Sequence, residues 1–434
     1  MTAATHPSAQ DEVVDLLREL IQINTSNPTH PERPAAEWVA AKLDEVGIES
    51  QIIEAAKGRA STLARIEGSD SSRPPLLIHG HLDVVPADAS EWSVDPFSGE
   101  IKDDCVWGRG AIDMKDMDAM TLALVREWAR SGTKPPRDIV LAFVSDEEAG
   151  GRLGAHYLVE KHPELFADCD AAISEVGGFS ISLNESARLY AVQVAEKGIN
   201  WLRLTASGAP GHGSMVHHDN AVTRLAEAVA RIGTHEWPIV ITDTVRSTVA
   251  ALSDITGQQL DPDSPDEWLP LLGSAARMIG ATIRNTANPT MLEAGYKANV
   301  IPSRASATID CRFLPGQEDE LLKTIDELIG DGILRESEVR DIAVETLFDG
   351  ALVDAMSAAL RAEDDGALPI PYLMSGGTDA KSFSTLGMRC FGFSPLRLPM
   401  GFDFMPLFHG IDERVPVDAL KFGVRVLDRF LAHC

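Results

Sequence analysis

Short apolar runs, each too brief for a helix, alternate with amphipathic stretches through the first half of the chain. The runs cover residues 62–66, 76–78, 139–144 and 171–173, and residues 117–128 between them have helical character. Runs that are apolar on both faces are typical of strands buried between helices, and strands that alternate with helices favour a parallel sheet. The pattern therefore predicts an α/β fold in which helices cover a largely parallel sheet.

The segments outside this pattern are of two kinds. Asp11 is expected to cap an N-terminal helix that ends before Ser26-Asn27-Pro28. Past residue 190, residues 199–207 and 306–313 have the character of half-buried strands, and residues 220–232 form an amphipathic pattern. We expect a second, α+β unit there. Residues 234–295 show no clear pattern.

The length of 434 residues exceeds what one hydrophobic core usually supports, so two domains are expected. The net charge of -28 repels nucleic acid and anionic membranes, and no apolar run reaches the roughly 18 residues of a membrane span. The five cysteines are scattered without a CxxC pair, which indicates reduced thiols. No secretion signal is evident at the start of the chain. These features predict a cytoplasmic protein that binds neither nucleic acid nor membranes.

Five groups of polar residues carry side chains that bind metals in proteins. Three of them directly follow predicted strands, where open α/β sheets collect ligands: His-Gly-His-Leu-Asp at 79–83, Asp-Glu-Glu at 146–148 and Ser-Glu at 174–175. The other two are the glycine-rich segment 108–115, which contains Asp113, and His409 in an apolar stretch. A divalent metal would relieve the repulsion between adjacent carboxylates. Together the groups predict a metal site at the strand ends.

Each group alone also fits a structural role. Asp113 after two glycines could cap a helix, the carboxylates at 146–148 suit a surface loop, and a lone histidine such as His409 is commonly a packed residue. The His-x-His pattern also occurs in metallo-β-lactamase-like proteins and amidohydrolase barrels. Metallo-β-lactamase-like proteins have a further histidine at the position where this chain has Val84. Amidohydrolase barrels need later histidine ligands that we do not find in the sequence.

Seven motifs follow one another in the order GHLDVVP (80–86), WGRGAIDMK (107–115), SDEEAGG (145–151), GHGS (211–214), NVIP (299–302), GGTDA (376–380) and His409. In content and order they resemble the zinc exopeptidase family of aminoacylases, glutamate carboxypeptidase and succinyl-diaminopimelate desuccinylase. The resemblance covers nearly the whole chain.

The resemblance implies two zinc ions per chain. His81 and Glu175 match ligands of one ion, Glu148 and His409 match ligands of the other, and Asp113 matches the carboxylate that bridges them. Three carboxylates and two neutral imidazoles leave two Zn²⁺ ions with one positive charge, which a bridging hydroxide neutralises. Imidazole and carboxylate ligands suit zinc, although Co²⁺ or Mn²⁺ would also bind such a set.

The resemblance also assigns catalytic and substrate positions. Asp83 matches the residue that holds His81, and Glu147 matches the general base that carries a proton from the metal-bound water to the leaving nitrogen. His212 matches a histidine that steadies the oxyanion from the partner subunit. The matched substrate positions are Asn299, Arg312, Gly376, Gly377 and Thr378.

Arginine suits a substrate carboxylate because its planar fork pairs with both oxygens. For Arg312, an ion pair with Asp310 is the structural alternative. The chain departs from the family pattern at Val176, which follows Glu175 where the family often has glycine.

These observations predict a zinc-exopeptidase-like α/β/α catalytic domain with a mostly parallel sheet, built from residues 1–190 and 350–434. Residues 191–349 are expected to form an inserted α+β lid and dimerisation domain, and the resemblance implies a homodimer. The expected reaction is hydrolysis of an N-acyl amino acid, or of the C-terminal peptide bond of a small peptide, by a di-zinc-bound hydroxide with Glu147 as base. The substrate carries a free carboxylate. The alternatives are succinyl-diaminopimelate desuccinylase and a non-catalytic binding member of the family.

Overall fold

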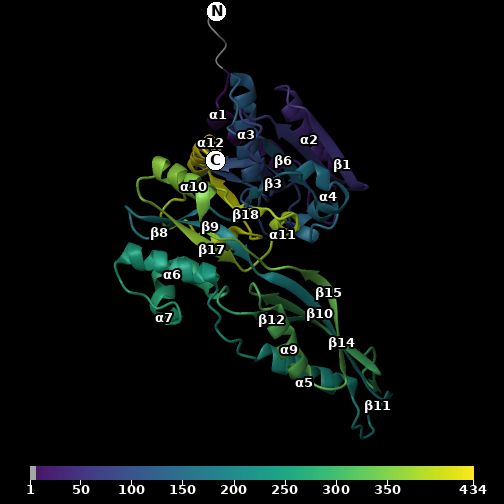
Figure 1. The fold of residues 1–434 in the computed structure, drawn as a ribbon. Coiled ribbons are helices and arrows are strands. Elements are labelled where there is room, and N and C mark those ends of the chain that lie inside the picture. The colour runs from purple at the N-terminus through teal and green to yellow at the C-terminus, as the bar shows by residue number, and fades with distance from the viewer. Residues whose placement is uncertain (1–5) are drawn as a thin grey trace, which may run out of the picture.

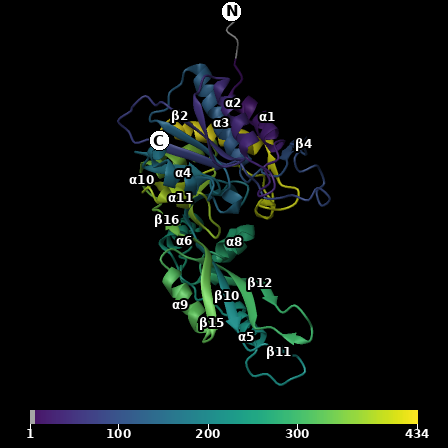
Figure 2. The same cartoon turned by 90° about the vertical axis from the view of Figure 1, so that its right-hand side faces the viewer.

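Residues 6–434, which the computed structural model describes, form two lobes one above the other in Figure 1. The upper lobe contains the largest sheet and the C-terminus, and the lower lobe contains a smaller sheet that ends in a long narrow tip. Figure 2 shows the same division from the side. Within the described residues, no helix is both long and apolar enough to cross a membrane.

The largest sheet among the described residues has ten strands, and its main path runs β1-β2-β6-β3-β7-β18-β9-β16. Its central strands β6, β3, β7 and β18 are parallel, whereas β1 and β2 add antiparallel pairs at one edge. β8 and β17 also pair with β9. The bounds are β1 (Ser50–Ala56), β2 (Arg59–Ile66), β3 (Leu76–His81), β6 (Ile139–Val144), β7 (Ala171–Ser174), β8 (Ser180–Ser182), β9 (Arg188–Glu196), β16 (Val344–Glu345), β17 (Ala367–Met374) and β18 (Arg389–Gly392). The four predicted runs all form strands, and the predicted α/β fold is confirmed.

Helices cover both faces of this sheet because successive strand residues point to opposite sides. In β6, Leu141 and Phe143 join the main core, while Val140 and Val144 join a smaller core on the other face. The main core includes side chains of α1 (Ala9–Ile21), α3 (Lys115–Ser131), α10 (Gly350–Glu363) and α12 (Val417–Leu431). The smaller core includes α4 (Ala155–Lys161) and α11 (Ala380–Ser384). Beyond these, α2 (Arg33–Asp44) packs on β1 and β2.

The N-terminal cap of α1 differs from the prediction. Ser8, not Asp11, is the N-cap residue, and its side chain accepts a hydrogen bond from the Asp11 backbone N–H. Asp11 stands at the third helical position, where its carboxylate accepts from the Ser8 N–H in return. This reciprocal arrangement satisfies two N–H groups at once, so the helix begins one turn earlier than the apolar spacing indicates.

The lower lobe contains a four-stranded sheet in the order β12-β14-β10-β15, and two helices pack on one of its faces. The predicted strands at 199–207 and 306–313 appear as β10 (Gly198–Ser207) and β14 (Arg304–Phe313), which pair antiparallel. The predicted helix at 220–232 appears as α5 (Ala221–Gly233). The remaining elements are β12 (Thr286–Ala294), β15 (Ile333–Asp341) and α9 (Glu318–Ile329).

The segment without a clear sequence pattern, residues 234–295, connects the two lobes. It contains α6 (Asp243–Thr256), α7 (Pro265–Trp268), η3 (Leu269–Ala275) and α8 (Ala276–Gly280) before β12 begins. The side chains of Val249 and Trp268 belong to the main core of the large sheet, and α6 lies against β17. These helices therefore pack with the upper lobe. The division of the chain at residues 190 and 350 stays a prediction.

The packing of α7 can be tested by removing its largest side chain. Trp268 is 0% exposed. We expect Trp268→Ala to lower the free energy of unfolding by about 3–5 kcal/mol, because it leaves a cavity in the main core. The matched control is Trp201→Ala on β10, whose side chain is 41% exposed, and it should cost under about 1 kcal/mol. Urea unfolding measures both, and equal small losses would contradict this packing.

Candidate metal centre

Three of the predicted ligand groups meet at one edge of the large sheet. His81 is the last residue of β3, η1 (Glu147–Ala149) begins shortly after β6, and Glu175 directly follows β7. Because β6, β3 and β7 are parallel neighbours, their carboxyl ends lie side by side. The local sequence thus places these side chains together, as predicted.

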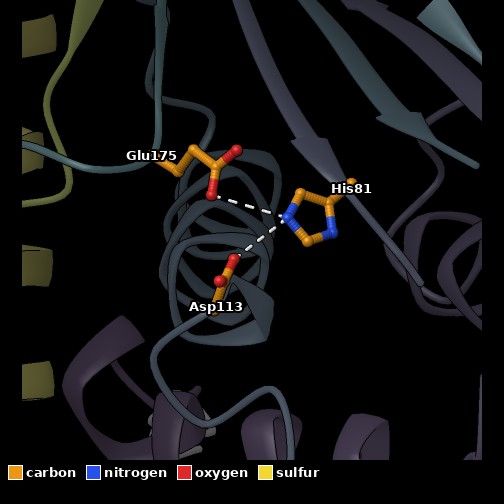
Figure 3. A group of neighbouring side chains, drawn as sticks. All are labelled: His81, Asp113 and Glu175. Carbon is orange, nitrogen blue, oxygen red and sulfur yellow. Dashed lines mark hydrogen bonds and ion pairs between the residues drawn. The ribbon is translucent and has the colours of Figure 1, made fainter. Parts of the chain in front are cut away.

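Two loops bring further predicted ligands to this edge. Asp113 lies shortly before α3, and His409 follows η4 (Met405–Leu407). Asp113 Oδ1 is 3.1 Å from His81 Nε2, and Asp113 Oδ2 is 3.2 Å from His409 Nε2. Glu175 Oε2 is 3.4 Å from His81 Nε2, and Glu148 Oε2 is 3.2 Å from His409 Nε2. Two groups of three candidate ligands therefore share Asp113. Figure 3 shows the first group, with the carboxylates of Asp113 and Glu175 both directed at the imidazole of His81.

The charges at this edge fit two divalent cations. Burial raises the pKa of Glu175 to about 7 and also raises the pKa of Glu148, so the ionised carboxylates need a nearby positive charge. Hydrogen bonds to Asp113 and Glu148 raise the pKa of His409 to about 10. Glu148 Oε1 is buried and has no hydrogen-bond partner among the described residues. Carboxylate and imidazole donors in these two groups suit zinc and similar ions.

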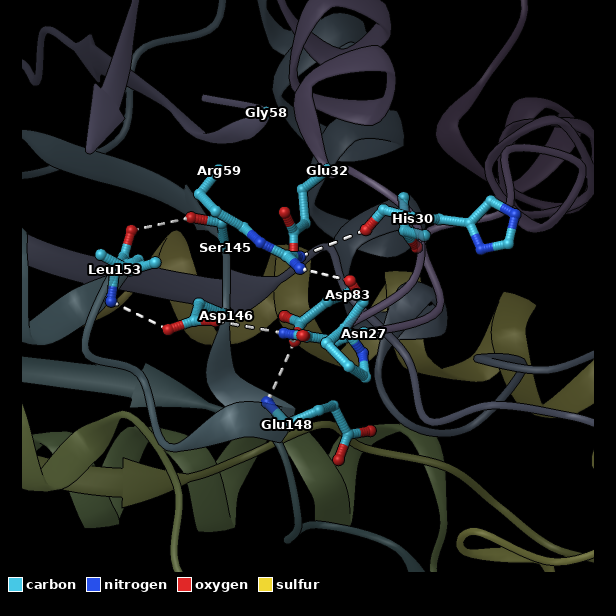
Figure 4. Close-up of polar contacts among 12 residues, drawn as sticks. Asn27, His30, Glu32, Gly58, Arg59, Asp83, Ser145, Asp146, Glu148 and Leu153 are labelled. Atoms are coloured by element: carbon cyan, nitrogen blue, oxygen red, sulfur yellow. Dashed lines mark hydrogen bonds and ion pairs between the residues drawn. The ribbon is translucent and has the colours of Figure 1, made fainter. Parts of the chain in front are cut away.

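Asp83 links the strand of His81 to the turn of the two glutamates, and Figure 4 shows its carboxylate between Asn27 and the backbone of Glu148. Its main-chain carbonyl oxygen lies 2.8 Å from His81 Nδ1, whereas its carboxylate Oδ1 is 3.8 Å from that nitrogen. The carboxylate accepts hydrogen bonds from the backbone N–H groups of Glu147 and Glu148, both at 3.1 Å, and from Asn27 Nδ2 at 2.9 Å. Asp83 thus contacts His81 through its backbone and holds the glutamate turn through its side chain.

Behind Asp83 lies a polar network that the sequence analysis did not identify. Asn27, which we used only as a helix-ending residue, also donates to Asp146 Oδ1 at 3.2 Å. Asp146 has a left-handed backbone with φ of 72°, so this turn needs the side-chain contacts that hold it. Arg59 pairs with the buried Glu32, whose pKa burial raises to about 7, and donates to the Pro28 carbonyl at 2.9 Å.

Glu413 is a further residue without a signal in the sequence. Its fully buried carboxylate accepts hydrogen bonds from the N–H groups of Gly110 at 3.1 Å, Ile112 at 2.8 Å and Asp113 at 3.3 Å. It also pairs with Arg109 at 2.7 Å. Glu413 therefore holds the loop that presents Asp113. These contacts join positions 300 residues apart, so no local pattern reports them.

Glu147, the predicted base, is half-buried among the carboxylates of the centre. Burial raises the pKa of Glu147 well above its ordinary value, the imidazole of His81 opposes this shift, and the charges of Glu175 and Asp379 add to it. Asp379 itself is buried just before α11, and its Oδ2 has no hydrogen-bond partner among the described residues. Asp379 lies inside the GGTDA motif (376–380), where no role was predicted for it.

The chain departs from the family pattern at Val176, in the turn after Glu175. Val176 has a left-handed backbone with φ of 53°, a conformation that a β-branched residue rarely adopts and glycine adopts freely. A Cβ atom on the next residue, Gly177, would lie 2.0 Å from the Gly392 carbonyl oxygen. The turn therefore packs tightly against the end of β18, and this contact keeps Glu175 directed at the centre.

The structure does not bring His212 and Asn299 to the centre of the same chain. β11 (Gly211–His212) pairs with β13 (Val300–Ile301) near the lower tip of the molecule, away from the large sheet in both Figure 1 and Figure 2. The Gly213 N–H donates to the Asn299 carbonyl at 3.0 Å. His212 is exposed, and its Nδ1 lies 2.8 Å from Ser214 Oγ. The two residues are neighbours of each other.

Arg312 and Thr378 already have partners within the chain. Arg312 on β14 donates to Asp310 Oδ1 at 2.7 Å and to Oδ2 at 3.1 Å, which is the ion pair that the sequence left as an alternative. The Thr378 hydroxyl donates to Glu196 Oε1 at 2.6 Å. These contacts fix both side chains in position.

The turn of Gly376 and Gly377 lies where the two lobes join. A Cβ atom at Gly377 would be 2.5 Å from Lys381 Nζ and 3.3 Å from Ile199 Cδ1, so glycine allows a close approach to β10. Ile199 is the partner of Arg312 in the register of the lower sheet. The predicted substrate residues Arg312, Gly376, Gly377 and Thr378 thus gather near this joint.

Comparison with known proteins gives concordant matches. The chain is 29% identical over 440 residues to the N-fatty-acyl-amino acid synthase/hydrolase PM20D1 of Xenopus tropicalis, covering 95% of this chain and 84% of the frog protein. It is 28% identical to aminoacylase-1 of Sus scrofa, with 98% and 95% covered. A metallo-carboxypeptidase of the M20 family from Sulfolobus solfataricus, Sso-CP2, shares the fold with a TM-score of 0.74 at 21% identity, over 98% of this chain and 99% of that chain.

The model of the peptidase family M20/M25/M40 matches residues 77–433, a span that includes both ligand groups and Glu147. The chain therefore belongs to the peptidase family M20/M25/M40 and is a metal-dependent amide hydrolase.

Proposed function

We propose that the protein hydrolyses N-acyl amino acids, or the C-terminal peptide bond of small peptides, with two zinc ions per chain. The observation that carries this proposal is the position of Asp113 between two three-residue groups, with Glu147 beside them. The similar frog and pig proteins are named for N-fatty-acyl-amino acids and for aminoacylase activity, which favours the N-acyl amino acid as substrate.

In this proposal His81, Asp113 and Glu175 hold one ion, and Asp113, Glu148 and His409 hold the other. The ions, when bound, polarise the scissile carbonyl and acidify water at the site. Glu147 accepts a proton from the attacking water on a carboxylate oxygen and then donates it to the leaving nitrogen. Its carboxylate suits this role by position, because it lies beside both groups and is not one of their six positions.

Arg312 and the turn at 376–378 would bind the free carboxylate of the amino acid. The guanidinium of Arg312 now pairs with Asp310, and a substrate carboxylate would bind on its remaining N–H donors. His212 would complete the site of the partner subunit in a homodimer. Its distance from the ligand groups of its own chain supports this arrangement, since an exposed tip is free to reach another molecule.

Metal content tests the two ligand groups separately. Elemental analysis should find about two metal ions per chain, and a strong chelator should abolish activity. His409→Ala should lower the content to about one ion, because it removes a ligand from one group, whereas Asp113→Ala should remove both. The matched control His156→Ala changes an exposed histidine outside the groups and should retain both ions. Full activity with one ion per chain would contradict the two-ion proposal.

The role of Glu147 is tested by a substitution that keeps its size. Glu147→Gln removes the proton acceptor, so turnover should fall by roughly 10²-fold or more while the metal content stays at the wild-type value. Steady-state kinetics and elemental analysis of the same preparation give both quantities. Loss of metal together with activity would instead identify Glu147 as a ligand.

A mixing experiment tests whether His212 acts across a dimer. His212→Ala chains and Glu147→Ala chains should each be inactive alone. Mixed dimers contain one intact site, made from Glu147 of one chain and His212 of the other. Random exchange makes half of the dimers mixed, so about a quarter of wild-type activity should return. If the chains exchange and the mixture stays inactive, the role across the dimer is wrong.

A further inference from the structure

The exposed tip of the lower lobe presents His212 on a short turn, which the label β11 marks in Figure 2. The His212 carbonyl accepts from the Met215 N–H at 3.0 Å, so residues 212–215 form a β-turn with Ser214 at its third position. The Gly213 N–H donates to the Asn299 carbonyl at 3.0 Å, and β11 pairs with β13 just before the turn. Backbone groups alone make these bonds, so the turn closes whether or not the imidazole contacts Ser214.

Two donors of Ser214 meet the same ring nitrogen of His212. The Ser214 N–H donates to His212 Nδ1 at 3.3 Å, and the Ser214 hydroxyl oxygen lies 2.8 Å from the same atom. A hydroxyl can donate or accept, whereas a backbone N–H can only donate. Nδ1 must therefore present its lone pair to Ser214. It follows that Nδ1 carries no proton and that the hydroxyl also donates to it.

This contact decides where the proton of the imidazole lies. A ring with a bare Nδ1 is neutral and carries its single proton on Nε2. Nε2 lies on the side of the ring away from Ser214, and the His212 side chain is exposed. The Nε2–H of His212 can therefore donate to a group outside its own chain.

We propose that Ser214 is a positioning residue, which holds His212 as a neutral imidazole with its proton on Nε2 and so prepares it to donate to the scissile carbonyl oxygen in the partner subunit. The inference rests on the proposed function, in which His212 completes the partner's site. Negative charge develops on that oxygen in the transition state, so a donor placed in advance stabilises it. The other neutral tautomer would turn a lone pair toward the same oxygen and repel it.

NMR of protein labelled with ¹⁵N-histidine tests the tautomer without any turnover. At about pH 8.5, above the usual titration range of imidazole, wild-type His212 should show a protonated Nε2 and a bare Nδ1. Its signals are those missing from the His212→Ala spectrum. In Ser214→Ala, which loses the hydroxyl donor, a fraction of the ring should carry its proton on Nδ1. Ser214→Thr keeps the hydroxyl and should give the wild-type pattern.

Steady-state kinetics test whether the contact matters for the reaction. With zinc-loaded protein and one N-acyl amino acid, Ser214→Ala should lower kcat by about three- to tenfold and leave KM within about twofold, because one hydrogen bond is lost and the oxyanion forms only in the transition state. Ser214→Thr should restore most of the loss. The matched control Ser303→Ala changes an exposed serine of the same lobe and should leave kcat unchanged.

A mixing experiment separates positioning from a general defect in folding. Ser214→Ala chains are mixed with an equal number of inactive Glu147→Ala chains, in which Ser214 and His212 are intact. In a mixed dimer, Glu147 of one chain meets an intact tip of the other. Activity should therefore rise several-fold although only inactive chains were added. Chains with both Glu147→Ala and Ser214→Ala are the matched control and should cause no rise.

These measurements distinguish failure of this inference from failure of the proposed function. A wild-type His212 with its proton on Nδ1, or a Ser214→Ala protein with unchanged kcat, would overturn the role of Ser214 and leave the hydrolase proposal intact. Absence of any amide hydrolysis would overturn the proposed function, while the NMR pattern would still establish the tautomer. A loss of kcat without a rise on mixing would overturn the action across the dimer.

Discussion

The concentration of negative charge at one edge of the large sheet is the constraint on which the rest of this site depends. Asp113, Glu148 and Glu175 lie within contact of two imidazoles, and Glu147 lies beside them. Burial alone raises the pKa of several of these carboxyls. Carboxylates this close cannot all ionise unless cations balance them. The arrangement is therefore stable in its ionised form when metal is bound, and binding contributes to the stability of this edge of the fold.

A second set of carboxylates holds the loops that carry the predicted ligands. Asp83 accepts two backbone N–H groups from the glutamate turn, and Glu413 accepts three from the loop of Asp113. Charged acceptors make stronger hydrogen bonds than neutral ones, so each loop is held firmly without using a ligand oxygen. The carboxylates of Asp113, Glu148 and Glu175 face the two imidazoles, whereas those of Asp83 and Glu413 bind backbone N–H groups.

The sequence predicted those parts of the site that depend on local patterns, and it did not predict those that depend on contacts between distant parts of the chain. The strand ends at His81, Glu148 and Glu175 follow from buried runs of the right length, because parallel neighbours bring their ends together. His409 required the resemblance to a family, since a lone histidine in a loop has no pattern of its own. Glu413, Asn27 and Arg59 could not be found, because their partners are distant in sequence. Glu413 accepts from backbone N–H groups, the Asn27 side chain donates to two carboxylates, and Arg59 pairs with a carboxylate and donates to backbone carbonyls. Residues 234–295 gave no clear pattern because they combine helices that pack on the core of the upper lobe with a strand of the lower sheet.

The packing of that segment shows that residues 243–280 belong with the upper lobe. Although η3 lies in sequence between strands of the lower sheet, it packs with α6 and α7 on the core of the upper lobe. Arg312, in contrast, belongs to the lower sheet, and it meets the turn at 376–378 where the lobes join. The position of Arg312 relative to the predicted ligands therefore depends on how the two lobes pack at this joint.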